Sequence, residues 1–135
     1  MFIQRCFIIK NSKELRDKVY RLGGRNGKWL NEASEIIACS HDMFRCHDLD
    51  LGAEYTLVNK GYIHCGKNEE LFLAIAALRD DSDIHQWFVH QDGSFLKCEC
   101  DSKIDMWGDY EYPQEVYPRK ATIEELIKHY GHEPI

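Results

Sequence analysis

The sequence contains no long hydrophobic run. Its longest stretch of consecutive apolar residues is the eight from Leu71 to Leu78, far fewer than the roughly 20 that a membrane-spanning helix needs. The amino terminus is apolar, but Arg5 interrupts it, and it lacks the small-residue cleavage site of a signal peptide. We therefore expect a cytoplasmic protein without a membrane partner.

Internal repeats and low-complexity tracts are also absent. The 135 residues are 44% hydrophobic and 30% charged, which is ordinary for a globular protein, and a chain of this length suits one domain. Strand-like runs and amphipathic helical segments together predict a single α+β domain over residues 1–135. We expect a mainly antiparallel sheet of five or six short strands, covered by a buried central helix and two further capped helices.

The central helix is predicted from Asn68 to Arg79. Asn68 is a good N-cap, and the two glutamates after it lie in the first turn, where the helix dipole favours negative charge. Arg79 is expected to close the last turn. Because the run between them is apolar on most of its circumference, we expect this helix to be buried against the sheet.

The other elements are predicted from caps, turns and hydrophobic spacing. A helix capped by Asn11 and another capped by Thr122, with Glu125 completing a capping box, should flank the domain. Residues 40–52 and 101–118 are expected to be loops. The expected strands are residues 2–10 and 35–39, a hairpin of 55–58 with 62–65, and a hairpin of 85–90 with 94–98.

Recognisable enzyme motifs are missing. No Ser-His-Asp, glycosidase or kinase pattern is present, and the glycines of residues 23–27 lack the spacing of a Walker loop. A thiol enzyme would need a cysteine beside a base. Cys65 is the best candidate because it precedes the central helix, but His64 would face the opposite side of a strand, so packing is the favoured role of Cys65.

Six cysteines are many for this length, but the reducing cytosol favours free thiols, mostly buried as small apolar residues. Cys39, His41, Cys46 and His47 supply four metal-ligand types within nine residues. Their spacing is not that of two zinc knuckles, so we expect no metal and no cofactor, although zinc at these residues stays an open alternative.

The net charge of −6 conceals an asymmetry. Residues 1–30 carry eight basic against two acidic side chains, whereas residues 79–112 carry nine acidic against three basic ones. Such polarity steers an anionic ligand to one side, or simply reflects two solvated faces. Duplex DNA is a poor partner for a chain this acidic overall.

Three segments combine cations with glycine or with a helix start, where free backbone N–H groups bind anions. A glycine-rich segment also offers a tryptophan on which a base can stack, although a helix-ending turn before a strand, with this tryptophan in the core, is the favoured interpretation. We expect at least two segments to line one concave surface, within the fold or across a dimer interface. The candidate ligand-binding residues are Arg25, Lys28, Trp29, Lys67, Asn68, Arg119 and Lys120.

Several stretches resemble small uncharacterised proteins of gut bacteria and their phages. They include residues 11–16, 65–83, 86–88 and 119–126, and the resemblance as a whole covers about half of the chain. The resemblance implies a phage or prophage accessory protein, a class that often acts by binding, including sequestration of nucleotide signals of host defence. It carries over no catalytic residues.

Two functions of different class follow. The first is a non-enzymatic protein in the host cytosol that sequesters a small phosphate-bearing ligand of the nucleotide type. The alternative is an interaction module that blocks a host protein through the aromatic, acidic residues 101–118. A thiol-dependent enzyme is the least favoured reading.

Overall fold

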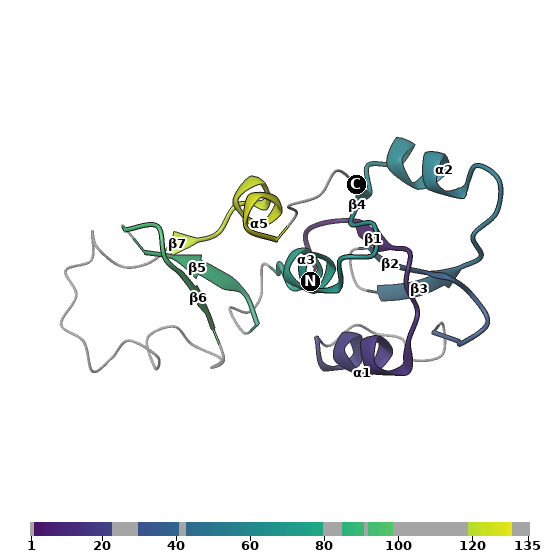
Figure 1. The fold of residues 1–135 in the computed structure, drawn as a ribbon, viewed down its shortest axis with the longest axis horizontal. Helices are drawn as coiled ribbons and strands as arrows, with labels where there is room; N and C mark the ends of the chain where they lie inside the picture. The colour runs from purple at the N-terminus through teal and green to yellow at the C-terminus, as the bar shows by residue number, and fades with distance from the viewer. Residues whose placement is uncertain are drawn as a thin grey trace.

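The chain folds as a single-domain α+β protein (Figure 1). The computed structural model describes residues 2–22, 30–40, 43–79, 85–90, 92–98 and 119–130. Within them, two sheets of four and three strands are joined by helices. The expected α+β class is confirmed, with seven strands in two sheets in place of five or six strands in one.

The larger sheet is built around the first strand of the chain. Its order is β3 (Met43–His47), β2 (Ile36–Ser40), β1 (Cys6–Ile8) and β4 (Ile63–His64). The β3–β2 and β2–β1 pairs are antiparallel, whereas β1 and β4 run parallel. All three residues of β1 are buried, as expected for a strand covered on both faces.

The smaller sheet is antiparallel, with the order β6 (Phe95–Lys97), β5 (Trp87–Val89) and β7 (Arg119–Lys120). Its β5–β6 hairpin was expected from the sequence. Gly93 between these strands has φ +90°, a conformation that glycine adopts without strain.

Helix α3 (Glu69–Ala76) lies at the centre of the molecule, between the larger sheet and α5 (Ile123–Tyr130) (Figure 1). Asn68 caps it by accepting a 3.1 Å hydrogen bond from the Leu71 N–H. Leu71, Phe72 and Ile75 are fully buried. This burial confirms the predicted central helix, and each large side chain contributes about 1.5–3 kcal/mol relative to exposure.

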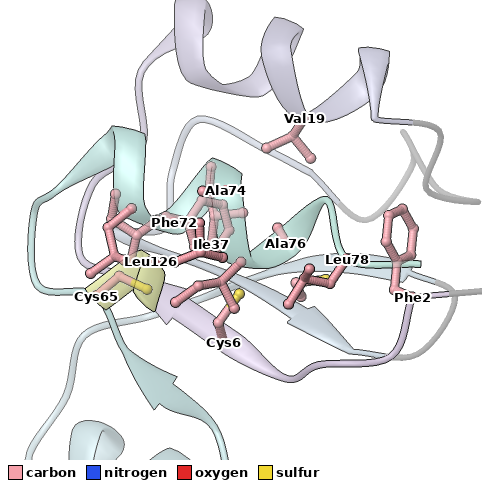
Figure 2. Close-up of a cluster of buried hydrophobic side chains, with 14 of the residues drawn as sticks. Phe2, Cys6, Val19, Ile37, Cys65, Phe72, Ala74, Ala76, Leu78 and Leu126 are labelled. Atoms are coloured by element: carbon pink, nitrogen blue, oxygen red, sulfur yellow. The ribbon is translucent and has the colours of Figure 1, made fainter. Parts of the chain in front are cut away.

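Figure 2 shows how the main core forms between α3 and the sheet. Phe72 of α3 belongs to this core, Val19 approaches from α1 (Lys13–Arg21), and Leu126 of α5 joins the same cluster. A smaller cluster covers the other face of the sheet, where Leu57 of α2 (Ala53–Asn59) meets Phe7.

Four boundary predictions were wrong. Residues 53–59 form α2 although Tyr55 and Val58 favour strands, because Gly52 starts a helix that buries Leu57 against the sheet. The predicted loop 40–52 contains β3, whose pairing with β2 outweighs its polar composition. Ser12, not Asn11, caps α1, and α3 ends at Ala76, so that Arg79 lies beyond it.

Candidate functional site: a basic and aromatic cleft

A cleft of about 450 Å³ opens beside α3. Leu73 and Ala74 of α3 contribute apolar surface to it. Lys18, Arg21 and Leu22 reach it from α1 and its end, Trp87 and Lys97 from the β5–β6 hairpin, and Tyr130 from the end of α5. The cleft is therefore formed by α1, α3, α5 and the β5–β6 hairpin together, which are far apart in the sequence.

Hydrogen bonds at two positions fix the helices that form the walls. At the start of α3, the Asn68 amide donates a 2.6 Å bond to the Tyr130 carbonyl, which ties the end of α5 there. Beyond the other end of α3, the Arg79 guanidinium donates to the Leu22 carbonyl at 2.9 Å, and the Gln86 amide donates to the Arg79 carbonyl at 3.2 Å. The cleft thus runs along α3 from Tyr130 toward Leu22.

Basic side chains outnumber acidic ones in the cleft. Lys18, Arg21 and Lys97 line it together with Glu70. Lys18 also forms a 2.7 Å ion pair with one carboxylate oxygen of Glu69. Lys10 forms a 2.7 Å ion pair with the other oxygen. These hydrogen bonds from Lys10 and Lys18 lower the pKa of the Glu69 carboxyl. The surplus of cations favours an anionic ligand.

One wall of the cleft is aromatic. The Trp87 ring lies 5.9 Å from the Tyr130 ring and 6.3 Å from Phe95, in edge-to-face arrangements. Phe95 in turn stacks on His129 at 4.3 Å. Burial, and secondarily the charge of Glu70, raise the pKa of the Tyr130 hydroxyl, so this group stays protonated and able to donate a hydrogen bond.

His85 at the cleft has an unusual backbone. Its φ is +66°, in the left-handed region that favours glycine. The conformation is held by a 2.7 Å hydrogen bond from the His85 N–H to the Cys98 carbonyl. Such outliers in non-glycine residues cluster at binding and catalytic sites.

The structure accounts differently for the residues predicted to bind a ligand. Arg25, Lys28 and Trp29 lie outside the described residues. Lys67 is exposed at the start of α3, and the Asn68 side chain is engaged as a cap and as a donor to α5. Binding of a ligand by these residues stays a prediction.

Arg119 and Lys120 lie at the other end of the α3–α5 pair. Arg119 forms an ion pair with Glu125 at 2.6 Å, and the Lys120 ammonium donates to the Arg79 carbonyl at 3.3 Å. Since α5 runs antiparallel to α3, the structure does not bring these two helix starts together.

Three of the described thiols form part of the main core. Cys6, Cys39 and Cys65 are fully buried under α3. Cys6 of β1 lies opposite Cys39 of β2 in the strand register, and both are free thiols. Burial, and then hydrogen bonding with the other two thiols, raise the pKa of Cys6. His64 packs on the opposite face of the sheet, 4.5 Å from the Phe7 ring, as the strand pattern predicted.

No metal site is evident where the chain is described. Among those residues, no group of three or more His, Cys, Asp or Glu side chains is arranged to hold an ion. Of the possible zinc ligands, Cys39 is buried, Cys46 contacts Asn31, and His41 lies outside the described residues. The same residues include no helix long and apolar enough to cross a membrane.

Sequence reasoning missed the cleft because its charges come from separate elements. Lys18 and Arg21 belong to the basic residues 1–30, for which a solvated face was the alternative explanation, and Lys97 lies in an otherwise acidic stretch. A usable signal was the i, i+3 spacing of Lys18 and Arg21, which puts them on one face of α1.

Comparison with known proteins supplies no relative. No protein-family model, no curated protein and no solved structure matches this chain.

Proposed function

We propose that the protein binds a small phosphate-bearing ligand of the nucleotide type in the cleft beside α3. The observation that carries this proposal is the convergence of Lys18, Arg21 and Lys97 on a cavity with an aromatic wall. Its volume of about 450 Å³ falls within the roughly 300–1,000 Å³ typical of small-molecule sites.

The chemistry of the walls supports such a ligand. Lysine and arginine form charge-assisted hydrogen bonds to phosphate oxygens, roughly twice as strong as neutral ones. Aromatic rings such as Trp87 stabilise a base by about 1–3 kcal/mol when it stacks on them. The apolar side chain of Leu73 and the methyl of Ala74 offer contact surface between the two.

We infer capture without turnover as the mode of action. Among the described side chains that line the cleft, we assign groups that bind a ligand and no nucleophile. In the setting that the resemblance to phage accessory proteins implies, capture would sequester a signalling nucleotide of host defence in the cytosol. A bound nucleotide should then be recovered chemically unchanged after the protein is denatured.

Isothermal titration calorimetry with nucleoside monophosphates, nucleoside diphosphates and inorganic phosphate tests the proposal. We expect Arg21→Ala to weaken nucleotide binding by about ten- to a hundredfold, because a charge-assisted hydrogen bond contributes about 1.5–3 kcal/mol. Lys13→Ala is the matched control, since Lys13 is exposed on the same helix and does not line the cleft. The absence of binding by every phosphate compound, or equal effects of the two substitutions, would refute it.

A second function, binding to another protein, is favoured by a different surface. Tyr55 and Val58, three residues apart on α2, are 73% and 49% exposed, and Leu51 just before the helix is 105% exposed. Contiguous exposed apolar side chains of this kind often mark interaction sites. The segment 101–118, to which the sequence pointed for this function, lies outside the described residues.

Native mass spectrometry of the purified protein separates the two functions. A co-purifying nucleotide that Arg21→Ala removes supports ligand binding. A co-purifying protein that Tyr55→Ser removes, while the neighbouring exposed substitution Thr56→Ala retains it, supports the interaction module instead.

A further inference from the structure

The two ends of the cleft differ in chemistry. Glu70 and Tyr130 lie at the end where α3 begins, because the Asn68 amide holds the Tyr130 carbonyl there at 2.6 Å. Arg21 and His85 lie toward the other end, because their neighbours Leu22 and Gln86 are both hydrogen-bonded to Arg79, beyond the end of α3.

The positions along α3 separate these ends by enough room for an extended ligand. Glu70 is in the first turn of the helix and Arg79 is nine residues later. A helical rise of about 1.5 Å per residue gives about 9 Å from Glu70 to Ala76, where α3 ends, and Arg79 lies beyond that end. Leu73 and Ala74 lie between them and line the middle of the cleft.

Among the described side chains that line the cleft, Glu70 is the one that carries a carboxylate. An ionised carboxylate only accepts hydrogen bonds. A ligand group that contacts the Glu70 carboxylate must therefore donate a hydrogen bond to it. A carbonyl oxygen in the same place would repel the carboxylate, which costs affinity.

Trp87 fixes the kind of ligand group that this end accepts. Its ring lies 5.9 Å from the Tyr130 ring, so two aromatic side chains stand beside Glu70. A flat heterocycle that carries an amino group satisfies both requirements, because its face packs on the rings and its N–H groups point to the carboxylate.

We propose that the ligand is a nucleotide whose base carries an exocyclic amino group, with Glu70 as the specificity-determining residue. This inference rests on the proposed function. The base lies against Trp87 and Tyr130, its amino group donates to Glu70, and its phosphate lies toward Arg21 at the opposite end of the cleft.

Two nucleotide pairs test the proposal by calorimetry on the full chain: adenosine against inosine monophosphate, and cytidine against uridine monophosphate. Within each pair an amino group is replaced by a carbonyl oxygen. We expect the amino form of at least one pair to bind about ten- to a hundredfold more tightly, as sites built to receive a hydrogen bond discriminate strongly.

Glu70→Gln should narrow this preference to about threefold or less, because the glutamine amide both donates and accepts. Glu14→Gln, at an exposed position of α1 outside the cleft, should retain the full preference. Circular dichroism checks that both variants keep the native fold, as expected for exposed side chains.

The outcomes distinguish this inference from the function on which it rests. Equal binding of amino and carbonyl forms, with Arg21→Ala still weakening both, would refute the role of Glu70 and leave the phosphate site in place. An unchanged preference in Glu70→Gln would do the same. Failure of every nucleotide to bind would refute both.

Discussion

Asn68 shows how one side chain can serve two elements. Its amide oxygen accepts from the Leu71 N–H at 3.1 Å, and its amide nitrogen donates to the Tyr130 carbonyl at 2.6 Å. The first bond caps α3, and the second satisfies a carbonyl at the end of α5 that has no partner within its own helix.

Substitutions at Asn68 should separate these two contributions. Asn68→Ser keeps a capping oxygen but loses the donor to Tyr130, so we expect it to cost about 1 kcal/mol of unfolding free energy. Asn68→Ala also removes the cap and should cost about 2 kcal/mol. Urea unfolding measures both, and equal losses would show that the cap contributes nothing.

At the level of the element, hydrogen bonds and an ion pair at its first turn stabilise α5. The Thr122 hydroxyl accepts from the Glu125 N–H at 3.2 Å, while the Glu125 carboxylate accepts from the Thr122 N–H at 3.0 Å. Arg119 holds the same carboxylate in a two-pronged ion pair. The capping box predicted for this helix is confirmed.

These bonds make the stability of α5 dependent on pH. Arg119 first, and then Thr122, lower the pKa of Glu125 from 4.5 to about 2. Because the folded-state pKa lies below the unfolded one, the stabilisation is present above about pH 4.5 and is lost as the pH falls toward 2.

We therefore expect Glu125→Gln to destabilise the protein at pH 6 and to have a smaller effect near pH 3. Thermal unfolding at the two pH values measures the difference. Glu124→Gln is the control, since its carboxylate is adjacent in sequence but outside the capping box. Parallel curves for the native protein and Glu125→Gln would contradict the assignment. The effect should be modest, because the Arg119–Glu125 pair is partly exposed to solvent.

At the scale of the whole molecule, the sequence predicted what local signals determine. Asn68 and Thr122 allowed the starts of their helices to be predicted, because capping depends on residues only three positions away in the sequence. The β5–β6 hairpin was predicted for the same reason. Residues 53–59 were misassigned because Tyr55 and Val58 favour strands locally, and only packing of Leu57 on the sheet decides for a helix.

The cleft could not be predicted in this way. Lys18, Lys97 and Tyr130 come from the two ends and the middle of the chain, and only the packing of α1, α5 and the smaller sheet around α3 brings them together. The charge asymmetry of the sequence pointed to a cationic surface in residues 1–30, but it did not identify Lys97, which belongs to an acidic stretch.

The left-handed backbone at His85 means that this position is not optimised for stability. A glycine there would adopt φ +66° without the penalty of about 1 kcal/mol that a side chain incurs. We expect His85→Gly to raise the thermal midpoint and to weaken nucleotide binding in the cleft. Paired melting and calorimetry would measure both effects. A higher thermal midpoint together with a lower nucleotide affinity would show that His85 favours ligand binding at a cost in the stability of the fold, a trade-off between ligand affinity and conformational stability.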